Sequence, residues 1–196
     1  LENIPDEGTI APASYDFGIG MTKAALIKKM QERQASILNE AWNTRQPNLP
    51  INTKQEALIL ASIIEKETSL KTERGKVSSV FVNRLLREIA LQTDASVVYG
   101  ITRGKKILGR GLRRSELKKD TPWNTYVNKG LPPSPIGNPG KASIHAALNP
   151  DITNYLYFVA DGSGGHAFAE NLREHNINVA KSVSYTHLRA HETRIH

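Results

Sequence analysis

The sequence predicts an α+β protein in which a helical body precedes a small β-hairpin near the C-terminal end. Apolar residues recur at helical spacing from about residue 22 to residue 90. A β-branched and aromatic run at residues 155–160 is followed by the turn-forming segment 161–165 and by a return through residues 166–168. Helices in front of a hairpin are typical of the α+β class.

Composition supports one globular domain, with a small appendage at most. The chain has 196 residues, of which 39% are hydrophobic and 23% are charged. A domain of roughly 100–200 residues is typical, and these proportions are too apolar for a disordered chain. The absence of cysteine excludes disulfides, thiolate metal sites and a cysteine nucleophile. The net charge of +7 leaves nucleic acid, an anionic envelope polymer or a membrane surface as partners that charge alone does not rank.

The first three helices follow from apolar spacing and from capping residues. Residues 1–20 are punctuated by glycine and proline and predict a loop or a short strand. A helix should start at Thr22 and end before the 48–50 segment. Thr53 and Glu56 have the spacing of a capping box, which opens the most apolar helix of the chain, with residues 57–70 inside it. A third helix is expected from about Thr72.

The remaining elements are shorter. Residues 92–94 should cap a short helix that ends at Gly100, and another helix is expected over residues 143–148. Residues 101–140 are irregular, basic and rich in glycine and proline, and so long a segment is more often functional than accidental. A last helix should run from about Glu170 to Lys181. Residues 182–196 resemble a translated adapter and are expected to be a non-native tail.

Glu65 is the residue that fits its surroundings least. It follows Ile63 and Ile64 and lies one or two helical turns after Ala61 and Leu58, on the apolar side. A carboxyl group there loses hydration, which favours the protonated form that a general acid supplies. The alternative is that the helix ends and Glu65 turns outward. Glu67 points to a different face and is expected to be solvated.

A second group of candidates combines aromatic rings with amides. These residues lie in segments expected to be loops: Gln92, Tyr99, Trp123, Asn124, Thr125 and Tyr126. Such a combination suits a sugar-binding groove, although each ring taken singly also suits the core. Asp94 has the position of a helix N-cap. The spacing of His145, His166 and His175 is not that of a helical zinc pair, so no metal site and no cofactor are expected.

Ordered motifs over residues 7–181 resemble the endolytic murein transglycosylases, the YceG-like family. The match starts at the Ala-Ser-Ile-Ile-Glu-Lys-Glu-Thr sequence of residues 61–68 and continues at residues 80–85, 91–94 and 98–100. It extends through residues 124–126, 130–133, 135–136, 155–160, 166–168 and 175–176. Departures occur at residues 7–15 and at Arg113, which replaces a small hydroxyl residue. They affect local details of the groove.

The resemblance implies an endolytic lyase acting on peptidoglycan. Such an enzyme cuts the β-1,4 bond between N-acetylmuramic acid and N-acetylglucosamine and leaves a 1,6-anhydromuramoyl end. On this basis residues 1–181 form the catalytic domain, and Glu65 is its general acid and base. Gln92, Asp94, Tyr99, Asn124 and Tyr126 would shape the groove and orient sugar hydroxyls.

Expectations about partners and location also come from the resemblance. Peptidoglycan glycan strands are the expected substrate, with peptidoglycan synthases as partners and no nucleic acid. Family members usually carry an N-terminal membrane helix and a LysM-like domain, both missing from this sequence. The native protein would be a single-pass membrane protein facing the periplasm or outer wall, whereas this fragment should be soluble.

Two other functions remain open at this stage. One is a glycoside hydrolase that uses Glu65 with Asp94 or Glu67 as the second carboxylate. The other is a glycan-binding module without catalytic activity, in which Glu65 is structural.

Overall fold

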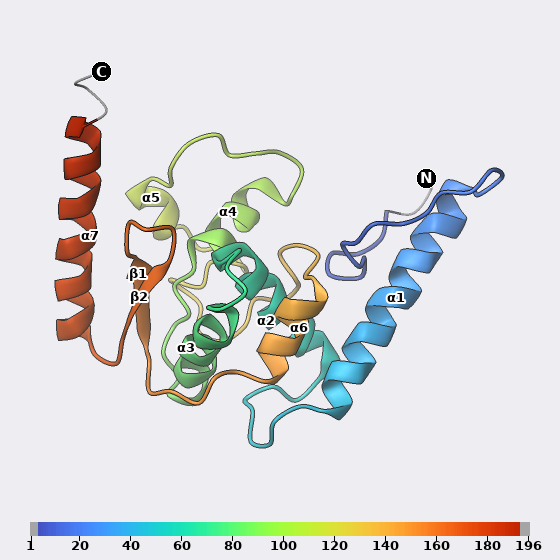
Figure 1. Cartoon of the computed structure of the whole chain (residues 1–196), viewed down its shortest axis with the longest axis horizontal. Helices are drawn as coiled ribbons and strands as arrows, with labels where there is room; N and C mark the ends of the chain where they lie inside the picture. Colours follow the sequence, from blue (N-terminus) through green and yellow to red (C-terminus); the bar gives the residue numbers. More distant parts are fainter. Residues whose placement is uncertain (1–3, 193–196) are drawn as a thin grey trace.

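The computed structural model describes the backbone of residues 4–192 and the side chains of residues 4–183. It confirms the α+β class, because the described residues form helices and one antiparallel hairpin. In chain order the elements are α1 Lys23–Asn43, α2 Lys54–Glu67, α3 Arg74–Leu86, α4 Asp94–Thr102, α5 Arg114–Leu117, α6 Lys141–Leu148, β1 Tyr157–Ala160, β2 His166–Ala169 and α7 Leu172–Glu192. In Figure 1, α2, α3, α4 and α6 form a central group, with α1 on one side and the hairpin and α7 on the other.

Helix α2 is the centre of the core. Its capping box is present as expected: the Thr53 hydroxyl accepts a hydrogen bond from the Glu56 N–H at 3.1 Å, and the Glu56 carboxylate accepts one from the Thr53 N–H at 3.2 Å. All eight residues from Ala57 to Ile64 are buried. A helix that is apolar on every side must be covered on every side, and α1, α3, α4 and α6 all contact α2.

Helix α1 packs on one edge of this core. It starts where the sequence indicates, because the Thr22 hydroxyl accepts a hydrogen bond from the Ala25 N–H at 3.1 Å. Gln34, which is only 2% exposed, joins two distant segments. Its amide nitrogen donates to the Gly8 carbonyl at 2.9 Å and to the Pro139 carbonyl at 3.0 Å. The glycine- and proline-rich N-terminal segment is thereby held against the loop that leads into α6.

The C-terminal elements differ only slightly from the expected boundaries. The β1–β2 hairpin is confirmed, with Phe158 opposite Phe168 in its register, although β1 begins at residue 157 rather than 155. Helix α4 runs from Asp94 to Thr102, so the expected end at Gly100 was wrong, and Thr93 rather than Asp94 is the N-cap residue, without a side-chain capping bond. The 101–140 segment is irregular as expected, apart from the end of α4 and the four-residue α5.

Helix α7 extends past the expected end at Lys181, as far as Glu192. The assignment of residues 182–196 as a non-native tail stays a prediction, and residues 193–196 lie outside the described part of the chain. Within that part, no helix combines the length and apolar character needed to cross a bilayer.

We expect Leu60→Ala to lower the free energy of unfolding by about 2–5 kcal/mol, because Leu60 is fully buried and a cavity would remain. Urea denaturation of both proteins measures this. Ile107→Ala is the matched control, since Ile107 is 94% exposed and its truncation should cost less than about 0.5 kcal/mol. Equal losses in the two variants would contradict the central position of α2.

Candidate active site

The last turn of α2 directs Glu65 and Glu67 into different surroundings. Glu65 is half-buried and lies against the start of α6. Its Oε2 accepts hydrogen bonds from the Gly140 N–H at 3.1 Å and from the Ser143 hydroxyl at 2.6 Å. Gly140 is the N-cap residue of α6, where unpaired N–H groups and the helix dipole favour a carboxylate. Glu65 therefore joins α2 to α6, a structural role for this carboxylate.

Glu67 lies in a cavity of about 170 Å³ beside the C-terminal end of α2. Its Oε1 accepts a hydrogen bond from the Thr93 hydroxyl. Burial raises the pKa of the Glu67 carboxyl, and the nearby charge of Asp94 raises it further. The Thr93 hydrogen bond and the proximity of His166 act in the opposite direction. The net upward direction of the pKa favours the protonated form, as a general acid requires.

Three of the predicted groove residues line the same cavity as Glu67. They are Gln92, Asp94 and Tyr126, which come from the segment before α4, from its first turn and from the loop after α5. The Tyr126 hydroxyl donates to Asp94 Oδ1 at 2.6 Å, which fixes the two side chains relative to each other. Burial and this hydrogen bond raise the pKa of Tyr126, so its hydroxyl stays protonated.

Gln92 has a backbone φ of +54°, in the left-handed region that non-glycine residues rarely adopt. Its N–H donates to the Thr125 carbonyl at 3.1 Å, and its side-chain oxygen accepts from Arg84 Nη1 at 3.2 Å. Non-glycine residues in this conformation are often found at functional sites, where the surrounding contacts hold them in place. The exposed Gln92 amide is thus fixed at the edge of the cavity.

The structure places Tyr99 and Asn124 elsewhere. Tyr99 packs on Trp123, with ring centroids 5.8 Å apart, and borders a separate hollow together with Lys66. Asn124 is fully buried. Its amide nitrogen donates to the backbone carbonyls of Leu117 and Lys119 at 3.0 and 2.8 Å, so its side chain holds the preceding loop together. The structure therefore does not gather all the predicted site residues around one carboxyl group.

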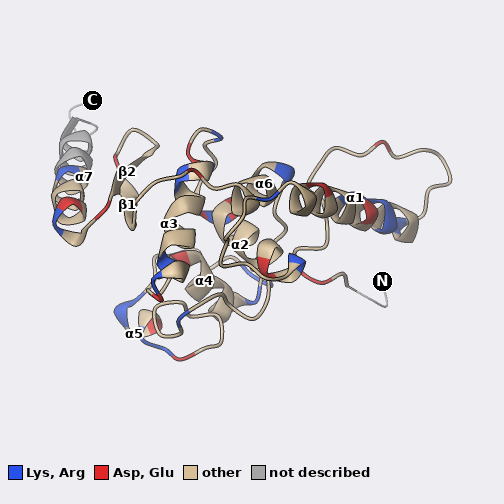
Figure 2. Ribbon diagram, turned by 90° about the horizontal axis from the view of Figure 1, so that it is seen from below, with Lys and Arg blue, Asp and Glu red and all other residues tan. Residues whose placement is uncertain are grey.

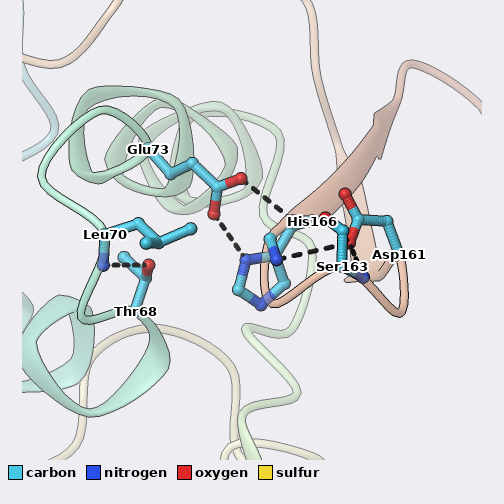
Figure 3. A network of polar contacts seen from close by, with 7 residues as sticks. Thr68, Leu70, Glu73, Asp161, Ser163 and His166 are labelled. Carbon is cyan, nitrogen blue, oxygen red and sulfur yellow. Dashed lines mark hydrogen bonds and ion pairs between the residues drawn. The ribbon is translucent and has the colours of Figure 1, made fainter.

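The β1–β2 hairpin supplies the opposite wall of the cavity through Phe158. It is attached to the start of α3 by Glu73, whose Oε1 accepts from the His166 N–H at 2.9 Å and whose Oε2 lies 2.7 Å from His166 Nδ1 (Figure 3). The hairpin turn has its own support, because Asp161 accepts hydrogen bonds from both the N–H and the hydroxyl of Ser163. Phe158 packs edge-on against the His166 ring, with centroids 5.3 Å apart.

Potential metal ligands and the distribution of charged residues are two further features of the structure. In the region that the structure describes, no three His, Asp or Glu side chains form a group that could hold a metal ion. Lys and Arg residues occur on α1, α3, α5 and α7 and in loops, interspersed with acidic residues (Figure 2).

The sequence interpretation ranked Glu67 below Glu65 and gave it a role only in the hydrolase alternative, although a signal for its burial was present. Glu67 follows Leu60, Ile63 and Ile64 by seven, four and three residues, and all three are fully buried. The spacing that placed Glu65 beside the apolar face therefore applies equally to Glu67. The expectation that Glu67 is solvated was wrong, because the structure half-buries its carboxyl group in the cavity.

Comparisons with known proteins find relatives of this chain in one family. A model of the YceG-like family matches residues 1–181. The endolytic murein transglycosylase of Bacillus subtilis (strain 168) is 38% identical over 181 residues, 92% of this chain and 49% of that protein. The endolytic murein transglycosylase of Streptococcus pneumoniae serotype 2 is 34% identical over 185 residues, 91% of this chain and 32% of the relative.

A solved structure extends the agreement to the fold. The crystal structure of a yceG-like protein from Listeria monocytogenes aligns with a TM-score of 0.73 at 34% identity, over 86% of this chain and 54% of that one. The chain thus spans between a third and about half of the length of these relatives. With a family match across residues 1–181 and a shared fold, the chain belongs to the YceG-like family.

Proposed function

We propose that this chain is the catalytic part of an endolytic peptidoglycan lytic transglycosylase in which Glu67 is the general acid and base. The observation that carries the assignment to Glu67 is its cavity, which brings a carboxyl group of raised pKa together with Gln92, Asp94 and Tyr126. The names of the relatives support peptidoglycan as the substrate. Glu65, the residue favoured by the sequence, accepts hydrogen bonds at the start of α6 and does not line this cavity.

One carboxyl group is sufficient for the proposed reaction. Protonated Glu67 donates its proton to the glycosidic oxygen as the bond from that oxygen to C1 of N-acetylmuramic acid breaks. The resulting carboxylate accepts the proton of the muramoyl C6 hydroxyl while the C6 oxygen bonds to C1. The product carries a 1,6-anhydro ring, the other fragment keeps the glycosidic oxygen as a hydroxyl, and Glu67 is again protonated.

Asp94 and Tyr126 fit supporting roles in this scheme. The negative charge of Asp94 helps to keep Glu67 protonated before the reaction, and it favours the positive charge that develops at C1 during bond cleavage. Tyr126 holds Asp94 in place through its hydroxyl group. Peptidoglycan synthases as partners and a single-pass membrane anchor stay expectations that come from the family resemblance.

A hydrolase is the second candidate, because Asp94 supplies another carboxylate within the same cavity. A hydrolase uses its second carboxylate to activate water or to form a covalent sugar intermediate. The two reactions therefore differ in their products rather than in their acid.

We expect digestion of purified peptidoglycan to release fragments with anhydromuramoyl ends, identified by mass spectrometry. The reason is that attack by the C6 oxygen leaves no reducing end. Fragments with reducing ends would assign the chain to the hydrolases instead.

We expect Glu67→Gln to lower the rate of this digestion at least about 100-fold, since proton transfer by a positioned side chain contributes roughly 10²–10⁴-fold. Glu65→Gln is the matched control on the same helix, and it should keep activity within about 10-fold of the wild type once its folding has been checked. A reversed order of the two variants would return the catalytic role to Glu65.

The rate should fall as pH rises through the raised pKa of Glu67, because the first step needs the protonated carboxyl group. Asp94→Asn removes a charge that raises this pKa and should move the descending limb of the pH–rate profile to lower pH. Thr93→Val removes the hydrogen bond that lowers the pKa and should move the limb to higher pH. Limbs that stay in place in both variants would contradict Glu67 as the acid.

A further inference from the structure

The cavity beside Glu67 has an apolar interior that proton transfer does not require. Four of its polar residues, Glu67, Gln92, Asp94 and Tyr126, are half-buried or exposed, whereas Thr93 and Arg84 are buried. The other side consists of apolar side chains, of which three are at most 2% exposed: Val80, Phe81 and Leu91, together with the half-buried Phe158. The cavity therefore has a polar rim and a floor that is apolar apart from Thr93 and Arg84, which suits a ligand group with one polar and one apolar end.

The size of the cavity limits what this group is. Pockets that enclose most of a drug-sized ligand have volumes of roughly 300–1,000 Å³. The volume here is about 170 Å³. A single substituent of a sugar fits such a space, whereas a whole sugar ring with its neighbours does not.

Arg84 provides a hydrogen-bond donor in the same cavity. This residue is only 7% exposed. Its Nε donates to the Leu156 carbonyl, and its Nη1 donates to the carbonyls of Ala90 and Leu91 and to the Gln92 side chain. Among the described residues, Nη2 has no hydrogen-bond acceptor and the guanidinium has no carboxylate partner. The guanidinium also lies over the Tyr157 ring, 5.1 Å from its centroid, and Nη2 is free to donate a hydrogen bond to a ligand oxygen that enters the cavity.

The charge of the rim indicates a neutral acceptor rather than an anion. Asp94 lines the small cavity, and Glu67 becomes a carboxylate once it has donated its proton, so a carboxylate or phosphate on the ligand would face negative charge. An amide carbonyl oxygen accepts a hydrogen bond from Arg84 without adding a charge. An amide that also carries a short apolar group matches both the donor and the floor.

We propose that the cavity binds the acetamido group of an N-acetylated amino sugar. The carbonyl oxygen accepts a hydrogen bond from Arg84 Nη2, and the methyl group packs on Val80, Phe81, Leu91 and Phe158. This inference rests on the proposed function and names the feature of the glycan that the site recognises. In such sugars the acetamido group is on C2, next to the C1 atom of the glycosidic bond, so its binding brings C1 close to Glu67.

The test compares initial rates of digestion on four preparations of one peptidoglycan: native, N-deacetylated, re-N-acetylated and N-formylated. For the wild-type chain we expect a loss of at least about 10-fold on the N-deacetylated material and full recovery after re-N-acetylation. The N-formylated material, which keeps the carbonyl but lacks the methyl group, should give an intermediate rate. Equal rates on all four would overturn the inference and leave the lytic activity intact, whereas no cleavage of native material would overturn the proposed function first.

Val80→Leu tests the floor and leaves the Arg84 side chain itself unchanged. The larger side chain occupies the space assigned to the methyl group, so we expect the rate ratio of N-acetylated to N-formylated material to fall several-fold. Thermal unfolding checks that the variant is folded, because extra volume in a packed core is itself destabilising. An unchanged ratio in a folded variant would contradict the position of the methyl group, and if the variant does not fold, the four-substrate comparison decides alone.

Discussion

The complete burial of α2 is the constraint on which the site depends. Because residues 57–64 are covered on every side, the helix cannot rotate or shift without exposing apolar surface. Its last turn therefore leaves the core in fixed directions, with Glu65 against α6 and Glu67 in the cavity formed with α3, the start of α4 and β1. One carboxylate stabilises the packing of two helices, and the other is held where burial changes its chemistry.

The buried position of Glu67 lowers the stability of the folded protein, and the size of this effect depends on pH. Burial raises the pKa of Glu67 in the folded protein above its ordinary value, so the folded state retains a proton that the unfolded state releases. The penalty is absent below the unfolded-state pKa and grows as pH rises toward the folded-state pKa. The large apolar core around α2 offsets this penalty. A half-buried carboxyl group with such a cost fits a chemical role better than a structural one.

Local sequence signals predicted the local structure, as the Thr53–Glu56 capping box, the start of α1 at Thr22 and the 161–165 turn show. The choice between Glu65 and Glu67 could not be made in this way, because the faces of α2 that lead to both residues are apolar. It depends on contacts with segments 75 and 26 residues away, at Gly140 and Thr93. The burial of Asn124 likewise results from loop carbonyls that no spacing rule identifies.

The cavity beside Glu67 is likewise built from segments that lie far apart in the sequence. The cavity takes residues from α2, α3, the 91–94 segment, the loop after α5 and β1. Arg84 connects three of these parts, since it lines the cavity from α3 and binds both the Leu156 carbonyl before β1 and the 90–92 segment. Glu73 attaches the other end of the hairpin through His166. Loss of either attachment would free the wall that carries Phe158, so the hairpin, although only two strands wide, is part of the candidate site rather than an appendage to it.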